Sequence, residues 1–274
     1  MTQLIHIRQR IKAIETTKKI THAMRLISMS THAQLKHRAH FVARYTHAMR
    51  SSYRQIWHIA KEKIQPPQAL LKQKKHLIFI VGSQKGLCGN FNVYLLYSLK
   101  EFHHEAADLI VIGKKILEYA QHQEHTILRS YSDLSLRTLF QYAQELTTIT
   151  LEYLDQYEYV SILSNIPKTF FLQKPQLQTL MPLPPLDNEV PSRIEYYWQQ
   201  DQEEVYSMML RAYLQASFYQ ALFESLLAEQ AARFISMDAA TRNAKKLLEA
   251  TKLQYNKFRQ SIITKELTEL SGNY

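Results

Sequence analysis

The last eighty residues before the final glycine constrain this chain most. Between Pro191 and Gly272 the sequence contains neither proline nor glycine. Proline in a helix interior costs about 3 kcal/mol and glycine about 1 kcal/mol relative to alanine, so residues 192–271 can stay helical throughout. A continuous helix of this kind would be roughly 120 Å long at 1.5 Å per residue. That is longer than any globular domain this chain could build, so we expect part of it to lie along another long element.

A second long helix is predicted at the start of the chain. Residues 3–65 also lack glycine and proline, and Pro66-Pro67 follows them. Proline disfavours helical geometry at the residue before it, so the helix should end there. Apolar residues recur with steps of mostly three and four, as in a coiled-coil stripe: Leu4, Ile7, Ile11, Ile14, Met24, Ile27 and Leu35. Lys18 and Thr21 interrupt the stripe, and polar groups at such positions lower stability but can fix register.

The middle of the chain has a different pattern. Short apolar, β-branched runs at 76–82, 109–113 and 159–163 predict buried strands, with helices between them at about 91–104, 114–122 and 136–154. Residues 169–172 and 176–180 are expected to add a hairpin or an edge strand. Alternation of strands and helices favours a parallel sheet with helices on its faces.

These patterns predict an α/β fold in four parts. An N-terminal coiled-coil helix occupies residues 1–66, and an α/β domain occupies 75–182. A proline-rich linker follows at 183–191, and a C-terminal coiled-coil helix occupies 192–274. Both terminal helices need cover for an apolar stripe, so we expect them to pair as an antiparallel coiled coil.

Charge is distributed unevenly along the chain. Residues 1–75 carry sixteen Lys and Arg but only two acids, Glu15 and Glu62. Such a segment indicates an acidic partner, which could be nucleic acid, anionic lipid or an acidic protein surface. No apolar run approaches the roughly 18 residues that span a bilayer. The N-terminus lacks the apolar core of a secretory signal, although its basic composition raises a mitochondrial presequence as an alternative.

No catalytic, cofactor or metal site is evident. The glycine-rich segment Gly82–Gly89 follows a strand, as phosphate-binding loops do, but it matches neither common phosphate-loop spacing. A glycine-enabled turn that presents Lys85 and Cys88 to a partner is favoured over nucleotide binding. His37 and His40 have no carboxylate within a helical turn, so a solvated helix face is favoured over a metal site. The single cysteine, Cys88, is expected to be a buried or turn thiol in a reducing compartment.

Three stretches, in the expected order, resemble the gamma subunit of F-type ATP synthases. They are IRQRIKAIETTKKITHAM (Ile7 to Met24), GSQKGLCGNFN (Gly82 to Asn92) and EQAARFISMDAATRNAKKLLEATKLQYNKFRQSIITKELTELSG (Glu229 to Gly272). The last stretch is the most specific. Because the resemblance begins near Leu4, the N-terminus is expected to be mature shaft and not a presequence.

The resemblance implies a rotor. In this family, an antiparallel coiled coil carries a Rossmann-like α/β domain and turns inside a ring of three alpha and three beta subunits. Its foot, with the epsilon subunit, sits on the membrane c-ring, so that ion flow drives ATP synthesis on beta. The implied chain is therefore a non-catalytic, peripheral subunit at the cytoplasmic face of a bacterial inner membrane, without a nucleotide or nucleic-acid site of its own.

The resemblance also implies which residues contact beta or couple rotation to catalysis. The implied residues are Met24, Arg25, Lys85, Cys88, Arg233, Arg259, Gln260, Thr264 and Glu266. His22 and His32 stand where relatives commonly have lysine. This predicts that the positive charge around these two residues rises below about pH 6.5. The chain ends at Tyr274 without the apolar tail of many relatives, which predicts a looser pivot.

Two other classes remain as alternatives. A nucleic-acid-binding coiled coil would use the basic N-terminal helix and show salt-sensitive affinity. A Rossmann-type enzyme would bind ATP or NAD as an isolated chain.

Overall fold

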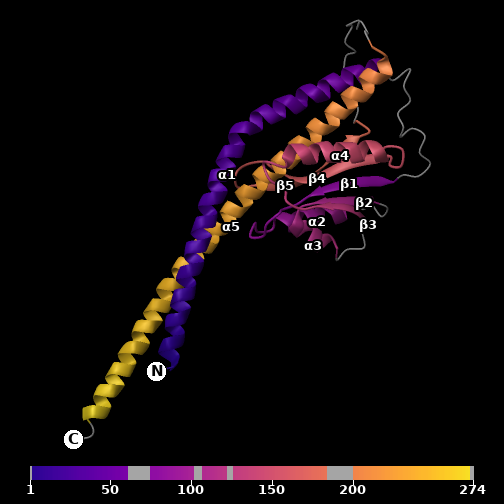
Figure 1. The fold of residues 1–274 in the computed structure, drawn as a ribbon. Coiled ribbons are helices and arrows are strands. Elements are labelled where there is room, and N and C mark those ends of the chain that lie inside the picture. The colour runs from indigo at the N-terminus through magenta and orange to yellow at the C-terminus, as the bar shows by residue number, and fades with distance from the viewer. Residues whose placement is uncertain (1, 61–74, 102–106, 122–125, 184–199, 272–274) are drawn as a thin grey trace. The chain divides into compact units, whose positions relative to one another are not determined.

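The computed structural model describes residues 2–60, 75–101, 107–121, 126–183 and 200–271. Contacts divide the chain into two compact units (Figure 1). We call Met1–Ser30 with Arg233–Tyr274 the helical unit, and Thr31–Ala232 the α/β unit. The elements are α1 (Thr2–Ala60), β1 (His76–Val81), α2 (Phe91–Glu101), β2 (Ala107–Ile112), α3 (Lys114–Ala120), β3 (Thr126–Tyr131), α4 (Leu139–Tyr153), β4 (Tyr159–Pro167), β5 (Gln173–Met181) and α5 (Gln202–Ser271).

The α/β unit contains one mixed sheet in the order β3-β2-β1-β4-β5. The first four of these strands are parallel, and β5 runs antiparallel to β4. In the central strand β1, Phe79 is in register with Ile110 of β2 and Ile162 of β4. Every residue of β1 is buried, as expected for a parallel strand whose two faces are both covered.

Helices cover both faces of the sheet. Helix α4 lies on one face and helices α2 and α3 on the other (Figure 1). Phe79, Val81 and Ile162 belong to a core that includes residues of α4, α1 and α5, whereas Ile78 and Ile80 belong to a core with α2 and α3. The period-2 alternation of β1 thus divides its side chains between two apolar layers.

Most predicted elements of the α/β unit are confirmed, with two corrections. Residues 169–172 form the turn between β4 and β5, and only the later segment, 176–180, is strand. Strand β3 was not predicted, because Thr126–Tyr131 is an edge strand with several exposed positions and an arginine, Arg129. Pro66-Pro67, most of the 183–191 linker and residues 192–199 lie outside the described residues.

Within the α/β unit, α1 and α5 are joined by aromatic side chains. The ring of Tyr53 stacks on Tyr213 with 5.0 Å between centroids, and its hydroxyl is 3.0 Å from that of Tyr206. The sequence predicts that six apolar residues in the first half of the C-terminal helix pack near the α/β domain: Met208, Met209, Leu210, Tyr213, Phe218 and Phe223. The last four of these are buried in the core, and Met209 is partly buried against it. Met208 is exposed, so that part of the expectation is wrong.

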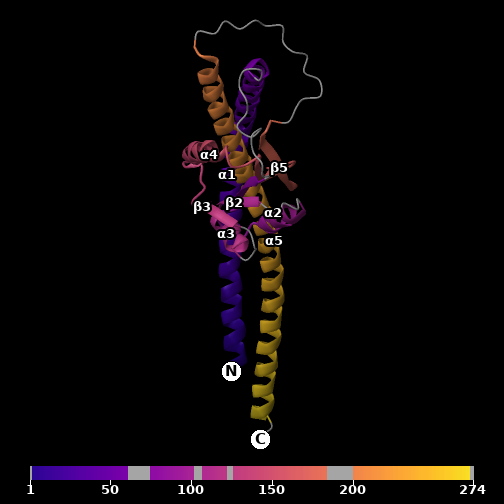
Figure 2. The same cartoon turned by 90° about the vertical axis from the view of Figure 1, so that its right-hand side faces the viewer.

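Within the helical unit, α1 and α5 run antiparallel as predicted (Figure 2). Cross-helix contacts join Glu15 to Lys252 and Arg25 to Asp238, so residue numbers rise along one helix as they fall along the other. Ile14 packs with Ala244 and Leu248 in an apolar layer.

The predicted apolar stripe of α1 is wrong at Ile27. Ile27 is 65% exposed, whereas the next residue, Ser28, is 1% exposed. Burial follows a strict seven-residue repeat through Ile14, Thr21, Ser28 and Leu35. The seven-residue repeat therefore continues along α1. Two of its buried positions, however, hold the polar residues Thr21 and Ser28 instead of apolar ones. In the described parts of the chain, no helix is apolar over a length that could cross a bilayer.

Candidate functional site

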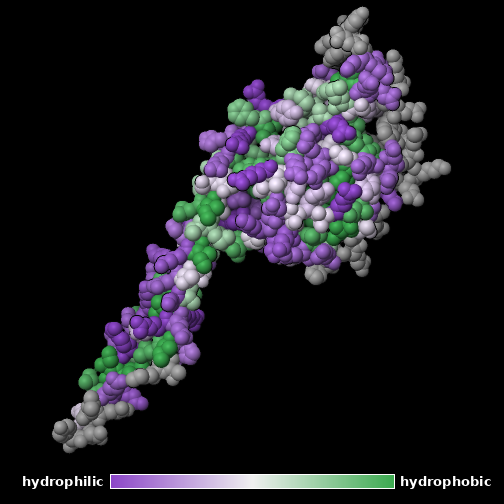
Figure 3. Space-filling view, in the orientation of Figure 1, coloured by the Kyte–Doolittle hydropathy of each residue, from purple (hydrophilic) through white to green (hydrophobic). Residues whose placement is uncertain are grey.

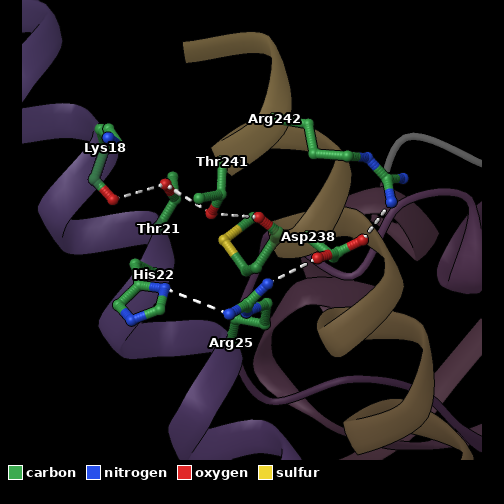
Figure 4. A network of polar contacts seen from close by, with 8 residues as sticks. Lys18, Thr21, His22, Arg25, Asp238, Thr241 and Arg242 are labelled. Atoms are coloured by element: carbon green, nitrogen blue, oxygen red, sulfur yellow. Dashed lines mark hydrogen bonds and ion pairs between the residues drawn. The ribbon is translucent and has the colours of Figure 1, made fainter. Parts of the chain in front are cut away.

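The helical unit contains a polar network across the seam between α1 and α5 (Figure 4). Arg25 Nη1 donates to Asp238 Oδ1 at 2.7 Å, and Arg242 Nη1 lies 2.6 Å from the other carboxylate oxygen, Oδ2. Arg25 Nη2 lies 3.2 Å from Nδ1 of His22. The hydrogen bond from Arg25, followed by the positive charge of Arg242, lowers the pKa of Asp238 below its usual value. Asp238 is thus an ionised carboxylate shared by two guanidinium groups.

Two threonines meet one turn away. The Thr241 hydroxyl lies 3.0 Å from that of Thr21 and 2.7 Å from the carbonyl oxygen of Met237. Thr21 in turn donates to the carbonyl oxygen of Lys18 at 3.1 Å. Thr21 is buried although polar, and these contacts satisfy its hydroxyl. Hydroxyl groups therefore take the place of an apolar coiled-coil layer here.

The seam continues toward the N-terminus of α1 with an apolar layer and an exposed ion pair. Ile14, Ala244 and Leu248 form the layer, and Lys252 Nζ lies 2.8 Å from Glu15 Oε1 beside it. The hydrogen bond from Lys252 is the main reason that the pKa of Glu15 is lowered. Hydrophobic patches interrupt the hydrophilic surface along these paired helices (Figure 3).

The glycine turn after β1 is closed by its own polar groups. The Ser83 amide donates to Asn92 Oδ1 at 2.9 Å, and Asn92 Nδ2 donates to Ser83 Oγ at 2.8 Å. Asn165, on β4, donates to the carbonyl oxygen of Phe91 at 2.9 Å. The turn lies where β1 meets β4 and the strand order reverses, which is where doubly wound sheets bind nucleotides. In this chain, Ser83 and Asn92 bond to each other at that place, and Asn165 bonds to the backbone of Phe91.

Cys88 faces inward in this turn, which corrects part of our prediction. Its side chain is 4% exposed, and its sulfur lies 3.5 Å from Ser83 Oγ and 3.8 Å from the carbonyl oxygen of Lys85. Lys85 and Leu87 are exposed, and Leu87 has a φ of 65°, which is uncommon for a residue with a side chain. The turn therefore presents Lys85 and Leu87, while Cys88 anchors it.

The remaining predicted site residues fall into buried and exposed groups. Arg233 is only 5% exposed, and Met24 is partly buried. Four residues of α5 are exposed: Arg259, Gln260, Thr264 and Glu266. The prediction missed Asp238, Thr241 and Arg242, although continuing the seven-residue repeat through Thr21 would have pointed to a polar seam.

His32 does not behave as predicted. It is buried, and its ring contacts that of Phe170 edge-on with 4.8 Å between centroids. Burial, and then the positive charge of Lys36, lowers the pKa of His32 below its usual 6.5. The gain of charge expected at this residue is therefore moved to lower pH than for an ordinary histidine.

The chain has two long terminal helices that pair antiparallel, and its α/β domain lies between them in the sequence. This element order places it among coiled-coil proteins with an inserted α/β domain. A family model described as ATP synthase matches residues 3–273. The ATP synthase gamma chain of Histophilus somni (strain 2336) is 32% identical over 282 residues, which cover 96% of each chain. That of Buchnera aphidicola subsp. Baizongia pistaciae is 31% identical over 284 residues, covering 98% of this chain and 97% of the relative. The chain belongs to the ATP synthase gamma chains, the central rotor stalk subunits of F-type ATP synthases.

Solved structures have the same fold. A chain of the Euglena gracilis mitochondrial ATP synthase OSCP/F1/c-ring structure matches with a TM-score of 0.74 at 18% identity, covering 99% of this chain and 93% of that one. A chain of the Tetrahymena thermophila mitochondrial ATP synthase central stalk/c-ring structure matches with a TM-score of 0.60 at 20% identity, covering 81% and 99%. Both of these neighbours are chains of mitochondrial ATP synthase structures.

Proposed function

We propose that this chain turns inside a ring of three alpha and three beta subunits and couples ion flow through a c-ring to ATP synthesis or hydrolysis. Catalysis belongs to beta, and the chain itself is a non-catalytic subunit. The epsilon subunit and the c-ring are its partners at the foot. We place the complex at the cytoplasmic face of a bacterial inner membrane, with this chain as a peripheral subunit.

The observation that carries the proposal is the exposed end of α5. Beyond Thr251, the side chains described up to residue 271 are exposed except for those of Tyr255 and Ile262, which are half-buried. Leucine and isoleucine side chains are exposed there beside Gln260 and Thr264. A helix end with exposed apolar side chains among polar ones fits a surrounding protein surface, and a ring of subunits supplies one.

Apart from Arg25, which binds Asp238, the predicted contact residues divide into two roles in this proposal. Lys85 and the four exposed residues of α5 touch the ring directly, and Met24 does so from α1. Cys88 and Arg233 do not touch the ring but support the residues around them, because their side chains are buried. Leu87 joins the contact set on account of its exposure.

Co-purification tests the proposal. Isolation of the membrane ATP synthase through an affinity tag on beta should recover this chain as a single copy per ring. A ring recovered with a different gamma chain, and never with this one, would refute it. Equilibrium dialysis of the isolated chain with ATP or NAD is the companion measurement, and binding there would favour the enzyme alternative.

A further inference from the structure

Arg25 lies on the side of α1 that faces α5, and its guanidinium binds Asp238 of α5. The side chains of Arg25 and Asp238 are 28% and 20% exposed. One terminal nitrogen of Arg25 reaches Asp238, and the other lies against His22, so the planar group is held at two points. Among the residues that the structure describes, its buried Nε finds no hydrogen-bond partner. To contact another subunit, Arg25 would first have to leave this ion pair.

Arg242 has the opposite exposure. Its side chain is 69% exposed, although it binds the same carboxylate as Arg25. One carboxylate between two guanidinium groups leaves one net positive charge, and the exposed group carries that charge at the surface. Lys245 and Lys246, about one helical turn further along α5, are exposed as well. At this level of the helical unit, α5 thus contributes Arg242, Lys245 and Lys246 to the surface charge, beside the exposed Lys19 of α1.

The hydrogen bonds between Arg25 and Asp238 are directional, so this ion pair can also fix the register of α1 against α5. Apolar contacts such as those of Ile14 with Leu248 tolerate small sliding and rotation, because they have no preferred direction. Charge-assisted hydrogen bonds have narrow geometry, and polar groups at seam positions are known to fix coiled-coil register. The Thr21–Thr241 contact lies next to the ion pair and depends on the same register.

We propose that Asp238 is a positioning residue that locks Arg25 into the seam, fixes the register of α1 against α5, and holds Arg242 outward. Arg242, and not Arg25, then offers positive charge to an acidic segment of the surrounding subunits. This second part rests on the proposed function. The first part concerns the chain alone.

A disulfide assay tests the register on the free full-length chain. Thr21→Cys with Thr241→Cys, in a Cys88→Ser background, places two thiols where hydroxyls now lie 3.0 Å apart. The rate of disulfide formation under copper phenanthroline should fall several-fold when Asp238→Asn or Arg25→Gln is added. Glu15→Gln is the matched control, since it removes a carboxylate from the exposed pair in the same seam and should leave the rate unchanged. Equal rates in all of these variants would overturn the register role.

The salt dependence of ATPase activity in a complex with alpha and beta tests the surface role. Arg242→Gln should flatten the dependence without changing the disulfide rate. Lys246→Gln, which does not contact Asp238, should flatten it less and should also leave the disulfide rate unchanged. Arg25→Gln should slow the disulfide while keeping most of the salt dependence. The reverse pattern, with Arg25→Gln flattening the dependence and Arg242→Gln leaving it intact, would overturn the assignment. If the wild-type chain fails to assemble with alpha and beta, the proposed function fails, and the disulfide assay still decides the register.

Discussion

The same two helices pair in two chemically different ways. In the α/β unit, α1 meets α5 through aromatic rings: Tyr53 is stacked on Tyr213, and Trp57 packs at a tilt against Tyr206. In the helical unit, the contacts are a small apolar layer, a pair of threonines and two ion pairs. Large rings bury much apolar area, whereas short polar side chains bury little. The aromatic pairing in the α/β unit therefore contributes mostly stability. The polar pairing in the helical unit contributes mostly a defined register between α1 and α5 and buries little apolar surface.

The difference suits a rotor stalk. The part of a shaft that turns within a ring must hold its own two helices in register, yet it cannot rely on a thick core. Directional bonds between Arg25 and Asp238 provide register at small cross-section. The α/β unit has no such restriction, since α1 and α5 share a core there with the sheet and α4.

The largest predicted effect is in the aromatic pairing. Tyr53→Ala should lower the free energy of unfolding of the α/β unit by about 3–5 kcal/mol, because it removes a fully buried ring. Tyr53→Phe is the matched control: it keeps the stack and loses only the contact with the Tyr206 hydroxyl, for about 1 kcal/mol. Urea unfolding of the full-length chain, followed by circular dichroism, measures both. Equal losses in the two variants would show that the stack is not what stabilises this pairing.

The apolar layer of the helical unit should matter less. Leu248→Ala should cost about 2 kcal/mol, at the low end for a buried leucine, because the layer is small and near solvent. Leu253→Ala, at an exposed position of the same helix, should change stability by less than about 0.5 kcal/mol. Protection of α5 amides from hydrogen exchange in the free chain distinguishes the two. A loss at Leu248 as large as that at Tyr53 would contradict the contrast between the units.

The sequence predicted the coarse fold well because long stretches without glycine and proline, and short β-branched runs, have few structural alternatives. It failed where the local pattern and the tertiary role differ. Ile27 looked like a stripe residue by its type, but the seven-residue repeat places Ser28 in the seam. Strand β3 lacked an apolar run because it lies at the edge of the sheet that the described residues form.

The candidate site could be predicted only in part. A resemblance pointed to Arg25 and Cys88 as contacts, yet the structure turns one toward Asp238 and the other into the glycine turn. Orientation of this kind depends on which residue of a distant segment lies opposite. Asp238 is 213 residues away from Arg25, so no local pattern carries that information.

A smaller, pH-dependent effect is expected at His32 in the α/β unit. The pKa of His32 is lowered in the folded chain, chiefly by burial and then by Lys36, so the unfolded chain binds the proton more readily. Folding stability contributed by this group is present above about pH 6.5 and declines as the pH falls through that value. His32→Gln should remove this decline, and His37→Gln, at an exposed position, should not. Identical urea midpoints from pH 7.5 to 5 for wild type and His32→Gln would contradict it.

The smallest effect is expected at the Glu15–Lys252 pair, and it sharpens the comparison within the helical unit itself. Both side chains are substantially exposed, at 42% and 52%, so solvent and salt screen their attraction. The lowered pKa of Glu15 means that the pair persists at neutral pH and is lost only as the pH falls through the lowered value. Glu15→Gln should therefore leave the thermal midpoint almost unchanged at 0.15 M salt. Asp238→Asn, which removes the negative charge that two guanidinium groups share, should shift it measurably. Equal shifts of the thermal midpoint in Glu15→Gln and Asp238→Asn would contradict this prediction. Both ion pairs would then act only as surface charge, and the lower exposure of Asp238 would not mark it as the contact that fixes the register.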